Sequence, residues 1–200
     1  NRVIQLPNIR IMAALAALFL ADAPQRFSLA GLSMGGILAM EILRQAPDRV
    51  ERLALLDTNP RAETVEAQAR RAPQIAKALA GELESVMRDD MKPNYLAPGP
   101  SQPAILDLCM EMAIALGPQV FASQSAALRD RPDQQATLAA FSGPALVLMG
   151  AEDKLCPLDR HQLMHDLMPQ SQLQIIPGAA HLPPLERPTE TAAALRDWLA

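Results

Sequence analysis

The stretch that decides the fold is Gly31-Leu32-Ser33-Met34-Gly35-Gly36. Before it, residues 26–30 form a short apolar segment that is typical of a buried β-strand. After it, residues 37–43 are apolar on nearly every side, which is typical of a helix buried under a sheet. A Gly-x-Ser-x-Gly pattern between a strand and a helix predicts a nucleophile elbow with Ser33 at its apex.

Sterics explain why glycines flank this serine. In so tight a turn, a side chain at Gly31 or Gly35 would collide with the opposite arm, and Ser33 is forced into a strained backbone conformation. The turn then holds the Ser33 hydroxyl clear of the backbone, and the N-terminus of the following helix favours developing negative charge. The alternative interpretation is a Gly-rich turn without chemistry.

The composition is that of a globular protein with one domain. The chain has 200 residues, of which 50% are hydrophobic, and a formal net charge of −4. This length is sufficient to bury a core. Lys and Arg are scattered along the acidic chain, which argues against a nucleic-acid partner. Cys109 and Cys156 have no metal-type spacing, so we interpret them as free thiols of a cytoplasmic protein.

The one long apolar run, residues 11–20, is rich in Ala and too short to span a bilayer. With Arg2 and Arg10 before it and Ala21-Asp22-Ala23 after it, the run also fits the core of a signal peptide. Cleavage there would leave the elbow strand almost at the new N-terminus. We therefore interpret residues 9–21 as a helix packed on the sheet and expect no membrane association.

Strands and helices alternate in the first and last parts of the chain. Further strands are predicted at residues 52–56, 145–149 and 173–176, and residues 3–6 are interpreted as a short strand remnant. A strand, a helix and a strand with a short return form a right-handed crossover. The fold class is therefore α/β, a mostly parallel sheet with helices on both faces, built from residues 1–60 and 139–200.

Residues 61–138 carry no strand signal and are predicted to form a helical cap inserted over the strand ends. Helices are expected at 64–80 with a break at Pro73, at 82–91 and at 105–116, with a loop at 93–103. The region contains Met87, Met91, Met110 and Met112. Methionine adapts to varied ligands, so these side chains either line a ligand pocket or pack the helices together.

Four polar groups follow the carboxyl ends of predicted strands: Ser33, Asp57, Asp153 and His181. Ligands of parallel α/β sheets bind at that edge. A serine hydroxyl needs a base to remove its proton, and histidine has a suitable pKa. These residue types therefore predict nucleophilic catalysis by Ser33.

The favoured base is His181, because the small residues of Gly-Ala-Ala-His-Leu-Pro allow its imidazole to approach. The alternative is a histidine in a surface loop. His161 and His165 lie four residues apart on one face of a predicted helix, and we expect that face to be solvated. A metal site there would need a third ligand that the sequence does not place, so no metal is expected.

A buried carboxylate is expected to hold the imidazole in one tautomer. Asp153 is favoured, because Gly150 before it allows a sharp turn out of the sheet. Asp57, at the end of the preceding strand, is its rival. Glu152 and Glu186 are weaker candidates, because we expect both to be solvated.

The chain resembles the α/β-hydrolase superfamily from about residue 11 to its end. Three motifs carry the resemblance: Gly-Leu-Ser-Met-Gly-Gly at 31–36, Gly-Ala-Glu-Asp-Lys-Leu-Cys-Pro at 150–157, and Gly-Ala-Ala-His-Leu-Pro-Pro-Leu-Glu-Arg-Pro at 178–188. Their order is that of the superfamily's serine, acid and histidine. The resemblance implies Ser33 as nucleophile, Asp153 as acid and His181 as base. It also implies the Met34 backbone N–H as an oxyanion donor and residues 61–138 as a cap domain.

The chain departs from the superfamily before the elbow. Members usually begin with several strands there, and a loop with a His-Gly stretch often supplies a second oxyanion donor. This chain resembles the family without its N-terminal strands. Loss of one donor lowers turnover by about 10²- to 10³-fold in a measured protease. The strand at 27–30 would then be an exposed edge, which predicts pairing with a second copy of the chain or with a segment outside this sequence.

The predicted activity is acyl transfer to water: Ser33 attacks a carbonyl, and water resolves the acyl-enzyme through His181. The elbow is similar to that of esterases and enol-lactonases, so the expected substrate is a small ester or lactone, with no cofactor. One alternative is hydrolysis of a C–C bond in a diketone. The other is a non-catalytic binding protein that retains the three residues without a second oxyanion donor.

Overall fold

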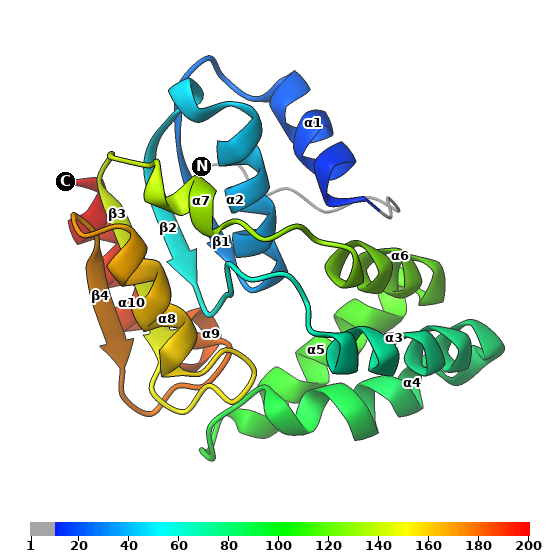
Figure 1. Cartoon of the computed structure of the whole chain (residues 1–200). Coiled ribbons are helices and arrows are strands. Elements are labelled where there is room, and N and C mark those ends of the chain that lie inside the picture. Colours follow the sequence, from blue (N-terminus) through cyan, green and yellow to red (C-terminus); the bar gives the residue numbers. More distant parts are fainter. Residues whose placement is uncertain (1–10) are drawn as a thin grey trace.

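Four parallel strands form the centre of the molecule in the computed structural model, which describes residues 11–200 (Figure 1). The strands are β1 (Phe27–Leu32), β2 (Val50–Leu56), β3 (Ala145–Gly150) and β4 (Gln172–Ile176), in the order β1-β2-β3-β4. Each neighbouring pair is parallel. The predicted parallel sheet is confirmed, whereas the strand predicted at residues 3–6 lies outside the described residues.

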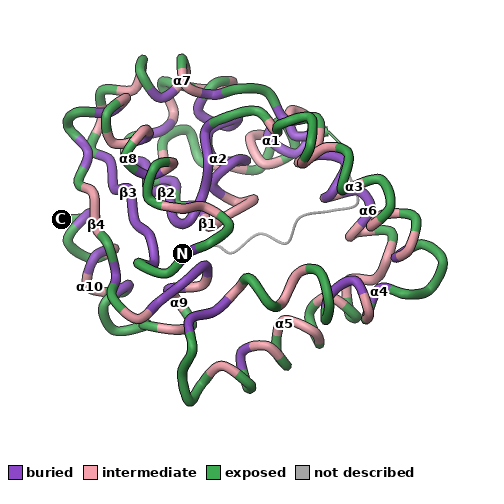
Figure 2. The backbone as a smooth tube through the Cα atoms, turned by 60° about the horizontal axis from the view of Figure 1, so that its bottom comes forward, coloured by how far each residue is buried: buried purple, intermediate pink, exposed green. Residues whose placement is uncertain are grey.

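Successive side chains of a strand point to opposite faces of the sheet, so the strands contribute to two cores. Leu53 and Leu55 belong to one core, and Ala54 and Leu56 belong to the other. The first core is covered by α1 (Met12–Asp22), α2 (Met34–Gln45), α7 (Gln135–Ala139) and α8 (Leu158–Leu167), and the second by α10 (Pro188–Leu199). The helices therefore bury β2 and β3 along most of their length (Figure 2).

A group of helices between β2 and β3 lies beside the sheet (Figure 1). These helices are α3 (Val65–Lys77), η2 (Ala78–Glu82), α4 (Leu83–Ser85), η3 (Val86–Met91), η4 (Lys92–Asn94), α5 (Gln102–Leu116) and α6 (Pro118–Arg129). They share a small core built around Val86 and Met87, against which Met110 and Phe121 pack. We call residues 61–138 the helical segment; the structure shows no strand within it.

Two features of the helical segment differ from the sequence prediction. Helix α3 continues through Pro73, and the chain leaves the helical conformation at Gly81 instead, where φ is 97°. Glycine adopts this conformation at no steric cost. Helix α6 is not predicted, because its start looks like a turn. Gly117, with a φ of 81°, ends α5, and Pro118 begins α6 at the position where proline is tolerated.

The Ala-rich run forms α1 and packs on the core, as predicted. Its residues Met12, Leu15 and Ala16 are buried, and the Phe19 ring meets the Phe27 ring of β1 edge to face with 5.5 Å between centroids. Within residues 11–200, no single helix has the length and hydropathy to cross a bilayer. Helices α5 and α6 have the required length and hydropathy only when they are taken together, and they are bent by 99° relative to each other.

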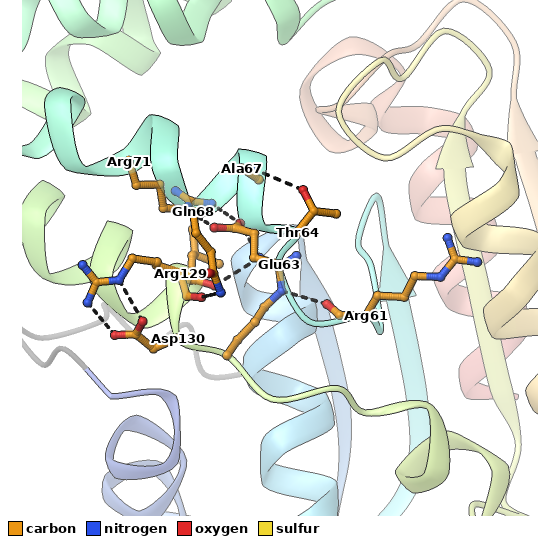
Figure 3. Close-up of polar contacts among 10 residues, drawn as sticks. Arg61, Glu63, Thr64, Ala67, Gln68, Arg71, Arg129 and Asp130 are labelled. Atoms are coloured by element: carbon orange, nitrogen blue, oxygen red, sulfur yellow. Dashed lines mark hydrogen bonds and ion pairs between the residues drawn. The ribbon is translucent and has the colours of Figure 1, made fainter.

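Buried charges join the two connections between the sheet and the helical segment. Glu63, on the first connection, forms an ion pair with Arg71 of α3 (Figure 3). It forms a second ion pair with Arg131 on the second connection. The Glu63 and Arg131 side chains are each 7% exposed. Arg131 Nη1 lies 2.6 Å from Glu63 Oε1, and Arg131 Nε donates to the Arg61 carbonyl at 3.0 Å. Each connection is therefore fixed to the other.

Candidate active site

Ser33 occupies the turn between β1 and α2 in a backbone conformation that few residues adopt. Its φ is 51° and its ψ is −116°, a strained combination for a residue with a side chain. The Ser33 N–H donates to the Leu56 carbonyl at 2.9 Å, and the Thr58 hydroxyl donates to the Ser33 carbonyl at 2.8 Å. The end of β2 therefore fixes the turn on both sides of the serine.

Steric contacts explain two glycines of the elbow, but not the pair that the sequence predicts. A Cβ at Gly31 would lie 2.2 Å from the Gly35 carbonyl oxygen, and one at Gly36 would lie 2.7 Å from the Thr58 side chain. A Cβ at Gly35 would meet no atom within 4 Å. The collision predicted at Gly35 is therefore wrong. Besides Gly31, the constrained glycine is Gly36 and not Gly35, because the first turn of α2 packs against Thr58.

The imidazole of His181 lies between Ser33 and Asp153. His181 Nε2 is 2.8 Å from Ser33 Oγ, and Nδ1 is 2.9 Å from Asp153 Oδ2. Because a carboxylate only accepts, Nδ1 carries the hydrogen toward Asp153 and Nε2 is left to accept from the hydroxyl. The side chains of His181 and Asp153 are 6% and 0% exposed. The fold thus brings the three predicted site residues into one chain of hydrogen bonds, largely out of water.

The turn after β3 holds Asp153 in place. Its Oδ1 accepts the N–H groups of Leu155 at 2.8 Å and Cys156 at 3.1 Å. Burial alone would raise the pKa of Asp153, but the hydrogen bond and charge of His181, together with these N–H groups, hold the pKa below its usual value. A Cβ at Gly150 would lie 2.0 Å from the backbone of the His181 loop. Glycine is therefore needed at this last residue of β3 because a side chain would collide with that loop, and not because of its backbone conformation.

Asp57, the rival carboxylate, faces the backbone and not the imidazole. It follows β2 with a φ of 44° and is completely buried. Its Oδ1 accepts the Gly150 N–H at 2.9 Å. Burial raises the pKa of Asp57 to about 9, against the effect of the Gly150 N–H and reinforced by the charge of Asp153. Near neutral pH, Asp57 is therefore uncharged and Asp153 is ionised.

Met34 is the first residue of α2 and directly follows Ser33. N–H groups in the first turn of a helix have no acceptor within the helix, and the helix dipole adds a positive field. This position is the one that an oxyanion donor requires, although the role stays a prediction. On the other side of Ser33, β1 is an edge strand whose only strand neighbour within residues 11–200 is β2. This part of the chain therefore brings no second strand and loop to that side.

A cavity of about 1060 Å³ reaches from Ser33 and His181 into the helical segment. Its lining answers the question about the methionines residue by residue. Met87, Met91 and Met112 line the cavity. Met87 and Met91 also belong to the core of the helices, where Met110 packs as well. The two interpretations therefore do not exclude each other, because Met87 and Met91 fit both. The polar part of the lining includes Glu63, Arg71 and Arg131 at the junction with the sheet.

One set of three potential metal ligands occurs within residues 11–200. An oxygen of Asp153, the Cys156 sulfur and a ring nitrogen of His181 lie within 4.8 Å of one another. The Asp153 carboxylate and the His181 ring are already hydrogen-bonded to each other. Burial, reinforced by the charge of Asp153, raises the pKa of the Cys156 thiol to about 12. A protonated thiol is a poor ligand, so the group fits a hydrogen-bonded pair better than a metal centre. Cys156 and Cys109 are both free.

The fold has counterparts in known proteins. Residues 5–194 match the alpha/beta hydrolase family. The chain belongs to this family. The resemblance that the three motifs carry is therefore confirmed, and so is the α/β-hydrolase fold.

Relatives in the family match nearly the whole α/β-hydrolase chain. It is 27% identical to the pimeloyl-[acyl-carrier protein] methyl ester esterase of Chromobacterium violaceum, over 93% of this chain and 75% of that protein. A thermophilic esterase from Thermogutta terrifontis has a TM-score of 0.85 and 31% identity, over 99% of this chain and 74% of that one. The enol-lactonase from Burkholderia xenovorans LB400 shares the fold, with a TM-score of 0.83 and 22% identity over 94% of this chain and 73% of that one.

Two histidines of this α/β hydrolase differ from the sequence prediction. His161, predicted to be solvated, is fully buried, and its Nδ1 lies 3.3 Å from the Pro157 carbonyl oxygen. Burial lowers its pKa. His165 is half-buried, with Nδ1 2.8 Å from the Ser171 hydroxyl. A spacing of four places both on one helix face, but tertiary packing decides that α8 turns this face toward the sheet.

Proposed function

We propose that this α/β hydrolase cleaves small carboxylic esters through an acyl-enzyme. The observation that carries the proposal is the unbroken chain of hydrogen bonds from Ser33 Oγ through His181 to Asp153. The named activities of two relatives support it, because both are esterases. A lactone is the second substrate class, supported by the enol-lactonase that shares the fold.

Each group has a role in this proposal. His181 Nε2 takes the proton of Ser33 as its oxygen attacks the ester carbonyl, and Asp153 stabilises the imidazolium that forms. The Met34 N–H donates to the developing oxyanion at the start of α2. His181 then protonates the leaving alcohol. The acyl-enzyme is released when His181 activates water for the second attack.

The helical segment supplies the substrate pocket in this proposal. Residues 1–60 and 139–200 form the hydrolase core, and residues 61–138 act as the cap. The side chains of Met87, Met91 and Met112 provide an adaptable apolar surface along the cavity. We therefore assign an apolar part of the ester to this region, with its carbonyl at Ser33.

One observation favours a second candidate, a non-catalytic binding protein. Because β1 is an edge strand of the sheet within residues 11–200, this region offers no strand and loop on the free side of β1 for a second oxyanion donor. One missing donor lowers turnover by about 10²- to 10³-fold in a protease. If the remaining donor were insufficient, the pocket would bind esters without cleaving them.

A fluorophosphonate probe, together with p-nitrophenyl acetate and p-nitrophenyl butyrate, separates the two candidates. Labelling with turnover supports the esterase, and the absence of both supports the binding protein. Ser33→Ala is the control variant. We expect it to lose labelling and turnover while it melts like the wild type, because removal of a hydroxyl from a turn costs little stability. Undiminished labelling of this variant would contradict Ser33 as the nucleophile.

A further inference from the structure

Glu186 lies at the C-terminal end of α9 (Pro183–Glu186), five residues after His181. It is half-buried and not solvated as the sequence suggests. Its carboxylate accepts three backbone N–H groups: Oε1 from Ala180 at 2.9 Å and Leu182 at 3.0 Å, and Oε2 from Ala97 at 2.8 Å. Backbone contacts of this kind leave no sequence pattern.

The two hydrogen bonds that Glu186 Oε1 accepts come from the two sequence neighbours of the base His181. Ala180 and Leu182 are the residues directly before and after His181, so one oxygen atom fixes the backbone on both sides of the imidazole. Hydrogen bonds from N–H groups to a carboxylate are shorter and stronger than those to a neutral acceptor. The side chain of His181 is held by Asp153, and its backbone is held by Glu186.

The contact of Oε2 reaches into the helical segment. Ala97 lies in the loop between η4 and α5, the same loop whose Tyr95 carbonyl accepts the His181 N–H at 2.9 Å. The rings of Tyr95 and His181 are stacked, with centroids 6.2 Å apart. Residues 95–97 and 180–186 are therefore joined by hydrogen bonds in both directions and by a ring contact.

We propose that Glu186 is a positioning residue that couples the loop at residues 95–97 of the helical segment to the base His181. Glu186 does not touch the reacting atoms. It fixes the position of the imidazole relative to Ser33. Through Ala97, that position also depends on the helical segment that lines the pocket. The catalytic part of this proposal rests on the proposed function, whereas the coupling of the two loops does not.

Glu186→Gln tests the proposal with almost no change in size. A glutamine has one carbonyl oxygen and one NH₂ group. The NH₂ group would therefore lie against a backbone N–H donor, either that of Ala97 or those of Ala180 and Leu182, and those hydrogen bonds would be lost. We expect faster deuterium uptake in peptides that cover residues 95–97 and 180–182 together. We also expect kcat to fall by about 10- to 100-fold with a smaller change in KM, because a displacement of the base by about 1 Å can cost 10²-fold.

Two further variants make the result specific. Glu152→Gln is the matched control, because Glu152 is exposed in the turn before Asp153, and we expect wild-type exchange and kcat. Glu186→Asp keeps the charge but shortens the side chain by one methylene, so at least one of the three hydrogen bonds is lost. This variant replaces Glu186→Gln in the experiment if the glutamine variant does not fold. A purely structural role would lower the melting temperature of either variant without lowering kcat below the transition.

The outcomes separate this proposal from the proposed function. Unchanged exchange at residues 95–97 in the position-186 variants would overturn the coupling, whether or not the protein is an enzyme. Faster exchange in both loops with wild-type kcat would overturn the positioning role. A wild-type protein without labelling or turnover would contradict the esterase, while exchange in the two loops would still decide the coupling.

Discussion

Asp57 and Asp153 end neighbouring strands, yet their carboxyl groups differ in charge. Asp153 receives a hydrogen bond from His181 and two from backbone N–H groups, and its pKa is lowered. Asp57 receives one from the Gly150 N–H in a completely buried position, and its pKa rises to about 9. An uncharged Asp57 supports the turn that carries Asp153, and an ionised Asp153 can stabilise an imidazolium.

This difference predicts unequal effects of the two Asp→Asn substitutions. Asp153→Asn should lower kcat for p-nitrophenyl acetate by about 10⁴-fold, because the amide favours the wrong tautomer of His181. Asp57→Asn should change kcat by less than about tenfold, because its Oδ1 can still accept the Gly150 N–H. Steady-state kinetics on both variants check the ranking. The reverse ranking would assign the acid to Asp57.

The raised pKa of Asp57 also predicts how stability depends on pH. An unfolded aspartate has a pKa of about 3.9, so between pH 4 and pH 9 the native protein binds the proton and the unfolded chain does not. The contribution of Asp57 to the free energy of unfolding is therefore fully present below pH 4. It is lost as pH rises, by up to about 1.4 kcal/mol per pH unit. Asp57→Asn should remove this loss and melt at a higher temperature than the wild type at pH 8.

Urea unfolding of the wild type and the variant from pH 5 to pH 8 measures this dependence. Asp48→Asn, at an exposed position, is the control and should leave the slope unchanged. A wild type that gains stability relative to Asp57→Asn as pH rises would show that Asp57 is ionised in the native state.

At the scale of elements, the strands and α2 could be predicted because their patterns are local. A run such as residues 145–149 is apolar throughout and is buried on both faces. Other features depend on tertiary contacts that leave no local pattern. The burial of His161 depends on how α8 packs, and the collision at Gly36 depends on Thr58, which is 22 residues away.

The ion pairs of Glu63 are expected to fix the helical segment to the sheet. Glu63→Gln leaves the buried guanidinium of Arg131 without its charge partner, and breaking a buried pair typically costs about 3–5 kcal/mol. We expect a lower urea midpoint and faster cleavage by protease at the two connections. Asp130→Asn is the control, because its pair with Arg129 is exposed (Figure 3), and such pairs contribute little. Equal effects of the two substitutions would contradict an anchoring role for Glu63.

At the scale of the whole molecule, the order β1-β2-β3-β4 leaves β1 and β4 at the edges within residues 11–200. The edge position of β1 is what the resemblance to the α/β-hydrolase superfamily implies for a chain without the superfamily's N-terminal strands. The sequence cannot show what covers the free side of β1, because pairing of an edge is decided by contacts between distant segments or chains. The two edges also differ in composition. Gln172 and Gln174 make β4 polar, whereas β1 is Phe27–Leu32, with Ser28 as its only polar side chain.

The last prediction concerns the free edge of β1. Unpaired N–H and C=O groups at a sheet edge pair readily with another strand, and a lysine at the edge opposes such pairing. We expect the purified chain to form a dimer through β1, and Ser28→Lys, at an exposed position of β1, to shift it to monomer. Gln172→Lys, at an exposed position of β4, is the matched control and should leave the dimer intact. Light scattering after size-exclusion chromatography measures the mass of each. A wild-type monomer that melts cooperatively would show that β1 is covered from within the chain. Equal dissociation by both lysines would place the contact elsewhere.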